Sequence, residues 1–152
     1  MSKMKIAVAS DHGGFKLKSK IKEYLQSTGY EICDFGTYSE DSCDYPDFAL
    51  PAAEAVSSGK CERGIIVCTT GIGVSMVANK VPGVRCALCH DEYGAELTRR
   101  HNDANVLAMG ERAVEEGKAL HIVEIFLKTE FEGGRHQRRV DKISAIEKKY
   151  GK

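Results

Sequence analysis

Short apolar runs alternate along this chain with segments in which apolar residues recur every three or four positions. The runs are bounded by Gly, Ser, Asp and Pro, a pattern typical of β-strands. They predict five strands, over residues 5–9, 30–35, 64–68, 84–89 and 106–109. The helical spacing predicts helices over about 17–28, 47–58, 73–80 and 91–101, a long one that includes 120–127, and a last one over about 137–149. This alternation predicts a parallel sheet with helices on both faces, an α/β fold.

These elements follow one another without a linker, repeat or low-complexity tract, so we expect a single domain over residues 1–152. The run Gly64–Cys68 is apolar throughout, as expected of a strand that is buried on both faces of a sheet. Pro51 fits poorly in the helix predicted over 47–58. It must lie in the first turn of that helix or kink it, because proline has no backbone N–H.

Ligands of open parallel sheets bind beyond the carboxyl ends of the strands. We therefore expect the residues that follow the predicted strands to converge on one crevice. These residues are Ser10-Asp11-His12, Cys68-Thr69-Thr70, His90-Asp91 and Met109-Gly110-Glu111-Arg112.

Composition narrows the class of protein. The chain has 22 basic and 22 acidic residues, so its formal net charge is zero, and we expect no general attraction to nucleic acid or to a membrane surface. No apolar run approaches the roughly 20 residues of a membrane span. Several of the six cysteines lie inside apolar runs, which predicts reduced thiols in a cytoplasmic protein.

Cys68 is the strongest candidate for chemistry. It ends an apolar strand and precedes Gly71 and Gly73, whose backbone amides could hold a phosphate or a developing oxyanion. The same surroundings suit a thiolate. The alternative is a packing cysteine without a chemical role, which is the interpretation that we favour for Cys86.

Two histidines are weaker candidates. His12 follows the first strand and could donate a hydrogen bond to a substrate hydroxyl or phosphate; the alternative is a capping Asp11 beside a solvated histidine. His101 follows a predicted helix end, where the ordinary pKa range of histidine suits proton transfer. Its alternative is a simple polar cap.

Arg135 and Arg139 are four residues apart and could share one helix face, forming a fork for a phosphate. Arg112 could join them from the rim of the crevice. The alternative is a solvated basic turn. Cys86-x-x-Cys89-His90 resembles a zinc motif only weakly, because residues three apart on a strand face opposite sides and no second ligand pair exists. We therefore expect no zinc site there, and we expect no cofactor.

Several motifs occur together in the order and at the separations found in one known family. The chain resembles the type B ribose-5-phosphate isomerases, which are grouped with the galactose-6-phosphate isomerase subunits, over nearly its whole length. The motifs are Ser10-Asp11-His12-Gly13-Gly14-Phe15, Asp44-Tyr45-Pro46, Cys68-Thr69-Thr70-Gly71-Ile72-Gly73, Ala78-Asn79-Lys80, His101-Asn102-Asp103-Ala104-Asn105, and Glu132-Gly133-Gly134-Arg135-His136-Gln137-Arg138-Arg139-Val140.

This resemblance implies a Rossmann-like three-layer α/β/α sandwich with a five-stranded parallel sheet. It implies an aldose–ketose isomerase that interconverts D-ribose 5-phosphate and D-ribulose 5-phosphate through a cis-enediolate, in the pentose phosphate pathway and without a metal. Members of the family work as homodimers or tetramers whose sites are shared between subunits. The last helix would then pack on a partner subunit and carry its arginines across the interface.

The resemblance also implies roles for single residues. Cys68 falls at the position of the catalytic base; a second branch of the family has a glutamate near the place of Ser75 instead. His101 falls at the position that opens the sugar ring, and Thr70 at one that relays protons. The positions that contact substrate are Asp11, His12, Tyr45, Thr69, Gly71, Ile72, Gly73, Ser75 and Asn102, and those that bind phosphate are Arg112, Arg135 and Arg139.

One residue departs from the family pattern, and other functions stay open. Most members have glycine at the place of Thr69, so a β-branched residue there could alter the backbone beside Cys68. A six-carbon substrate, allose or galactose 6-phosphate, is the first alternative. A phosphocysteine carrier, a cysteine phosphatase and a non-catalytic sugar-phosphate sensor are others. A phosphatase needs an arginine where this chain has Val74.

Overall fold

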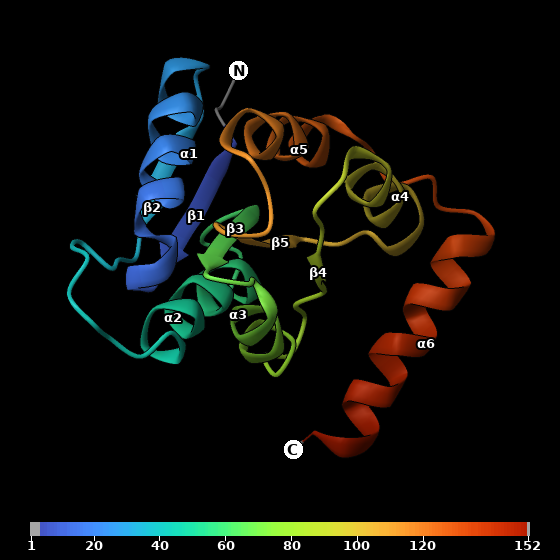
Figure 1. Ribbon diagram of the computed structural model, residues 1–152. Helices are drawn as coiled ribbons and strands as arrows, with labels where there is room; N and C mark the ends of the chain where they lie inside the picture. The colour runs from blue at the N-terminus through green and yellow to red at the C-terminus, as the bar shows by residue number, and fades with distance from the viewer. Residues whose placement is uncertain (1–3, 152) are drawn as a thin grey trace.

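Five parallel strands form the single sheet of the computed structural model, which describes residues 4–151 (Figure 1). Their spatial order is β2-β1-β3-β5-β4. The bounds are Lys5–Ser10 for β1, Glu31–Asp34 for β2, Arg63–Cys68 for β3, Cys86–Leu88 for β4 and Val106–Gly110 for β5. The predicted five-stranded parallel sheet is confirmed. Residues 1–3 and 152, which the expected domain includes, lie outside the described part of the chain.

Six α-helices connect and follow the strands. They are α1 (Phe15–Ser27), α2 (Pro46–Ser57), α3 (Ile72–Ala78), α4 (Glu92–Asn102), α5 (Glu116–Lys128) and α6 (Arg135–Tyr150), and a 3₁₀ turn, η1 (His12–Gly14), precedes α1. The helices lie where they were predicted, and those with predicted bounds agree within a few residues at each end; α5 includes the predicted 120–127. No helix in residues 4–151 is long and apolar enough to cross a membrane.

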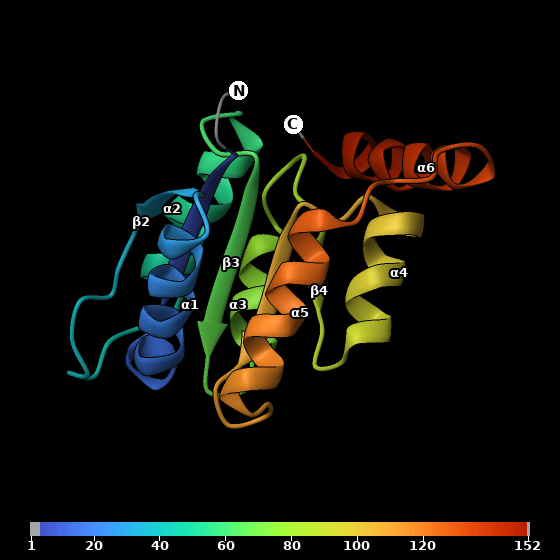
Figure 2. The same cartoon turned by 90° about the horizontal axis from the view of Figure 1, so that it is seen from above.

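Helices cover both faces of the sheet, so the molecule has three layers (Figure 2). One apolar cluster joins α1, α4 and α5 to the sheet, and a second joins α2 and α3 to its other face. Five of the six residues of β3 are buried, which confirms that this strand is covered on both sides. Burial of its side chains fixes β3 at the centre of the sheet, between β1 and β5.

Two local predictions need correction. Pro51 lies inside α2, five residues after the first helical residue, and therefore in the second turn rather than the first. Because proline has no backbone N–H, the helical hydrogen bond to the carbonyl of Asp47 is missing. The fourth strand is shorter than the predicted 84–89, because the backbone N–H of Arg85 donates to the side chain of Asn105 (2.8 Å) instead of a neighbouring strand.

The last helix stands apart from the sheet and packs on α4 (Figure 1). A groove of about 740 Å³ separates α6 from α3, β4 and α4. Three large apolar side chains of α6 line this groove and are exposed: Ile143, Ile146 and Tyr150. Helix α6 thus presents an apolar face that its own chain leaves uncovered.

A buried ion pair ties α1 to the end of β2. The Lys18 side chain is 2% exposed, and its Nζ lies 2.9 Å from Oδ1 of Asp34 and also donates to the carbonyl of Thr37. Burial opposes the ionisation of Asp34, but the Gly36 amide, Lys18 and Lys22 outweigh it and hold the pKa of this carboxyl below its ordinary value. The pair anchors the start of the loop that leads to Tyr45.

Lys18→Met is expected to lower the free energy of unfolding by about 3 kcal/mol, because it leaves a mostly buried carboxylate without its nearest cation. Lys20→Met is the matched control on the exposed side of the same helix and should change stability by less than about 0.5 kcal/mol. Urea unfolding measures both. Equal stability of the two variants would show that the buried pair does not hold α1 in place.

Candidate active site

The end of β3 holds the thiol of Cys68 in a defined setting. Cys68 is 5% exposed, and its Sγ accepts a hydrogen bond from the backbone N–H of Gly71 at 3.1 Å. Gly71 has φ 78°, in the left-handed region, and a Cβ there would lie 2.7 Å from the carbonyl carbon of Met109. Only glycine fits both demands. The turn therefore directs an amide at the sulfur, which stabilises negative charge on it.

Some of the backbone amides that follow Cys68 donate hydrogen bonds within the loop, and others are unpaired in the part of the chain that the structure describes. Gly71 donates to the sulfur, and Ile72 donates to Oγ1 of Thr70 at 3.2 Å. The amides of Gly73 and Val74, in the first turn of α3, have no hydrogen-bond partner within residues 4–151. These two donors, rather than the whole run from Gly71, are free to bind an anionic oxygen.

Two hydroxyl groups flank these amides. The hydroxyl of Ser75 donates to the carbonyl of Ile72 at 2.6 Å, so its proton is engaged within α3. Oγ1 of Thr70 accepts from the Ile72 amide, so its own proton is free to donate outward. Thr70 is thus suited to relay a proton. Ser75 is poorly suited to donate a hydrogen bond to a ligand, because its proton is already engaged.

Thr69 fits the loop without backbone strain. Within residues 4–151, Asp103 is the one non-glycine residue with positive φ, so Thr69 does not occupy a conformation that demands glycine. Its carbonyl accepts the backbone N–H of Arg112 at 3.1 Å. Its hydroxyl lies against Gly13, where a Cβ would collide with it. Threonine at this position therefore imposes no left-handed backbone strain on the loop.

Asp11 and His12 follow β1 beside this loop. Oδ1 of Asp11 accepts the backbone N–H groups of Gly13 (2.9 Å) and Gly14 (3.1 Å), so Asp11 caps the turn η1. Nδ1 of His12 accepts the backbone N–H of Cys43 at 3.2 Å. Because Nδ1 is an acceptor, the proton of the neutral ring is on Nε2, which is then a donor.

A hollow of about 310 Å³ lies at this edge of the sheet. The strand-end residues that line it are His12, Thr69, Glu111 and Arg112, together with Gly13, Lys16 and Glu40. Tyr45 lies against Gly73 of the Cys68 loop, since a Cβ on Gly73 would come within 2.6 Å of its ring. Residues that follow β1, β3 and β5 therefore share this hollow, which confirms the prediction in part. Cys68, Thr70, His90 and Asp91 were also expected in the crevice and do not line this hollow.

Sequence reasoning missed Lys16, Glu40 and the role of Glu111. Lys16 and Glu40 form an ion pair at 3.8 Å across the hollow. Glu111 accepts the backbone N–H of Leu17 at 2.8 Å, which ties the loop after β5 to the start of α1. Lys16 comes one turn after His12, so the strand-end rule could have found it; Glu40 lies in a loop without a pattern.

A second group of predicted residues lies at the opposite edge of the sheet. His101 and Asn102 end α4, and Arg135 and Arg139 begin α6. The carbonyl of Asn102 accepts Nε of Arg85 at 3.0 Å, just before β4 begins. Figure 2 shows α6 and the end of α4 at the end of the molecule away from the head of the β3 arrow. One chain therefore does not bring these four residues to Cys68.

An ion-pair network fixes the turn that follows His101 and Asn102. Asp103 adopts a left-handed conformation (φ 48°) at the end of α4. Its carboxylate pairs with the buried Arg99 at 2.8 Å, and its carbonyl accepts Nη2 of Arg85 at 2.9 Å. Asparagine and aspartate tolerate this conformation better than most residues.

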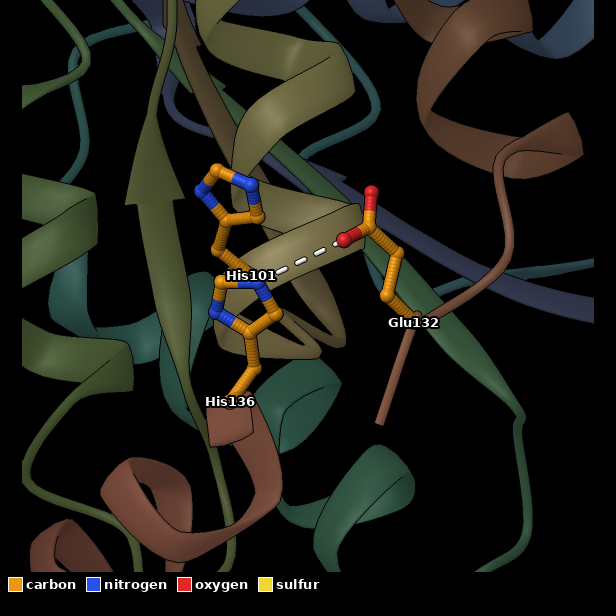
Figure 3. A group of neighbouring side chains, drawn as sticks. All are labelled: His101, Glu132 and His136. Carbon is orange, nitrogen blue, oxygen red and sulfur yellow. Dashed lines mark ion pairs between the residues drawn. The ribbon is translucent and has the colours of Figure 1, made fainter. Parts of the chain in front are cut away.

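His101, Glu132 and His136 form one cluster at this edge (Figure 3). One potential ligand atom from each lies within 4.8 Å of the others. The two imidazole rings are stacked, with centroids 4.2 Å apart and planes 12° apart. A metal ion binds in the plane of an imidazole at about 2.0–2.1 Å, so no ion can lie in both of these planes. The arrangement does not suit a shared metal.

The weak zinc motif is used for packing. Burial raises the pKa of Cys86 to about 12 and that of Cys89 to about 11, so both thiols stay protonated. Nε2 of His90 accepts the backbone N–H of Gly110 at 3.0 Å, and burial lowers the pKa of this ring. His90 thus supports the end of β5, whereas Cys86 pairs with Val106 at its start.

Comparisons with known proteins identify the family of this chain. The family model described as Ribose/Galactose Isomerase matches residues 6–143. The protein named Ribose-5-phosphate isomerase B from Escherichia coli is 47% identical over 145 residues, which cover 95% of this chain and 97% of that protein. The chain therefore belongs to the ribose/galactose isomerase family.

Solved structures show the same fold. Ribose-5-phosphate isomerase B of Clostridium thermocellum has a TM-score of 0.96 and 57% identity, over 97% of this chain and all of that one. The enzyme of that name from Mycoplasma genitalium, solved with bound ribulose-5-phosphate, has a TM-score of 0.93 and 45% identity, over 97% of this chain and 99% of that one. The Rossmann-like α/β architecture is thus shared across the family.

The contact between Cys43 and His12 makes a spectroscopic prediction. In ¹⁵N-edited spectra at neutral pH, the neutral His12 ring should carry its proton on Nε2. Cys43→Ser keeps the backbone N–H and should keep this tautomer, whereas Cys43→Pro removes the donor and should yield a mixture of tautomers. A wild-type ring protonated on Nδ1 would contradict the contact.

Proposed function

We propose that this protein is a ribose-5-phosphate isomerase, which interconverts D-ribose 5-phosphate and D-ribulose 5-phosphate. The observation that carries the proposal is the setting of Cys68: a nearly buried thiol, hydrogen-bonded to the Gly71 amide, beside two free amides of α3. Family membership and the relative solved with bound ribulose-5-phosphate support this substrate.

The reaction moves one proton between neighbouring carbons of the open-chain sugar. Cys68, as a thiolate, takes the proton from C2 and returns it to C1, and an amide hydrogen bond to its sulfur stabilises the charged form. The negative oxygen of the cis-enediolate is bound by the amides of Gly73 and Val74. Thr70, whose hydroxyl proton is free, relays protons between the two sugar oxygens.

The substrate must also be opened from its ring form and held by its phosphate. His101 opens the ring, and Asn102 contacts the sugar. Asp11, His12 and Tyr45 contact the substrate from the Cys68 side, with Thr69, Ile72 and Ser75 of the loop. The phosphate is held by three guanidinium groups, Arg112, Arg135 and Arg139, so that its binding energy positions the reacting carbons.

The two groups of residues meet in an oligomer. Cys68 and Arg112 lie at the carboxyl edge of the sheet, whereas His101, Arg135 and Arg139 lie at the other edge, so each site takes one group from each of two chains. The exposed apolar face of α6 supports this arrangement, because a symmetric dimer buries the same patch of each subunit. Each chain is one isomerase domain, and α6 packs on its partner in a dimer or tetramer.

A phosphatase is the weaker alternative. Position 74, where a phosphatase needs an arginine to bind the transition state, holds a buried valine. The neighbouring groups, Gly73 and Ser75, cannot replace a guanidinium fork.

Cys68→Ser is expected to lower kcat for ribose 5-phosphate by at least about 100-fold, because a hydroxyl is a far weaker base than a thiolate. Cys33→Ser, a partly buried cysteine in β2 away from the loop, is the matched control and should keep wild-type kcat. Assays on ribose, allose and galactose phosphates side by side establish the preferred sugar. Full isomerase activity in folded Cys68→Ser would contradict the base assignment, and turnover of no sugar phosphate by the wild type would contradict the function.

A further inference from the structure

His136 is a buried side chain to which the proposed reaction assigns no role. It lies in the first turn of α6, between the two phosphate-binding arginines of that helix, and is 6% exposed. Its ring stacks flat on that of His101, with centroids 4.2 Å apart (Figure 3). The ring of His101 has no hydrogen-bond partner within the described residues 4–151, so the stack is the contact that defines its plane.

Glu132 and His101 both contact His136, whose Nε2 makes no hydrogen bond within residues 4–151. Glu132 places a carboxylate oxygen 3.4 Å from Nε2 of His136. The backbone N–H of Glu132 donates to the carbonyl of Arg100 at 3.0 Å, and its carboxylate pairs with the Arg100 guanidinium at 3.5 Å. Arg100 directly precedes His101 in α4. The contacts therefore run from α4 through Glu132 to α6 and return to α4 through the stacked rings.

The surroundings of His136 favour a neutral ring. Burial lowers the pKa of His136, and the neighbouring His101, Arg135 and Arg139 lower it further, while Glu132 opposes them. A neutral ring adds no positive charge to a region that already holds two arginines. The neutral ring of His136 therefore gives His101 a flat, uncharged surface on which to stack.

We propose that His136 is a positioning residue, a flat platform that fixes the ring plane of His101 and its distance from Arg135 and Arg139. The inference rests on the proposed function, in which His101 opens the sugar ring while these arginines hold the phosphate. In the ring form of a sugar phosphate the distance from the ring oxygen to the phosphate varies little, so the group that opens the ring must lie within a narrow range of distances from the group that binds the phosphate. Small displacements of a catalytic group cost rate steeply.

The test compares two apolar replacements of similar bulk. His136→Phe keeps a flat ring, whereas His136→Leu fills the space without one. We expect His136→Leu to lower kcat for ribose 5-phosphate by about 10- to 100-fold with KM changed less than about threefold, and His136→Phe to keep most of the wild-type kcat. Gln137→Ala, an exposed change in the same turn, is the control. Thermal unfolding confirms that each variant is folded.

A second readout does not depend on activity. The stacked ring of His136 shifts the proton resonances of the His101 ring, so these resonances should move in His136→Leu and stay closer to wild type in His136→Phe. Unchanged His101 resonances in His136→Leu would overturn the stack. Wild-type kcat in that variant, or equal losses in both variants, would overturn the platform.

His101→Asn, assayed beside these variants, distinguishes a failure of the His136 platform from a failure of the proposed function. If His101→Asn loses activity while His136→Leu keeps it, the platform fails and the proposed function stands. If His101→Asn keeps full activity, the role of His101 in the proposed function fails, whatever the His136 variants do.

Discussion

The polarity of a parallel sheet decides where each functional residue of this chain can lie. Every strand ends at the same edge, and the helix that follows a strand must run back to the opposite edge before the next strand begins. Cys68 ends a strand and His101 ends a helix, so the two lie at opposite edges of one sheet. In the proposed function, the residues of the strand end and those of the helix end therefore meet between two chains.

At each edge of the sheet, a left-handed backbone turn orients the groups that surround the candidate residues. At the carboxyl edge, the left-handed Gly71 directs its own amide to the thiol, and the amides of Gly73 and Val74 in the first turn of α3 have no partner within residues 4–151. At the other edge, the left-handed Asp103, held by Arg85 and Arg99, ends α4 just after His101 and Asn102. Both turns use residue types that tolerate positive φ, and both present functional groups on otherwise rigid elements.

Much of the fold follows from the sequence, because apolar periodicity reports burial directly. The uninterrupted run that forms β3 required a strand covered on both faces, and that is where it lies. The carboxyl-edge site followed from the same reasoning, since a strand end fixes the direction of the next residues. Pro51 was harder to place, because tertiary packing of the surrounding alanines stabilises α2 despite the lost hydrogen bond.

The other edge of the site could not be derived from local pattern. His101, Arg135 and Arg139 carry no periodic signal, and their interpretation came from resemblance to a family. The stacking of His136 on His101 joins residues 35 positions apart and is invisible to any local pattern. Glu40 was missed for a similar reason, since it lies in an irregular loop and reaches the hollow only through the folded backbone.

The central claim, a site built from two chains, can be tested by mixing two inactive variants. Cys68→Ser and His101→Asn chains, unfolded together in equal amounts and refolded, should pair at random. Half of the dimers then contain one chain of each kind, and each of these has one intact site, so the account predicts about a quarter of wild-type activity. A mixture as inactive as its two parents would contradict the claim and place the whole site in one chain.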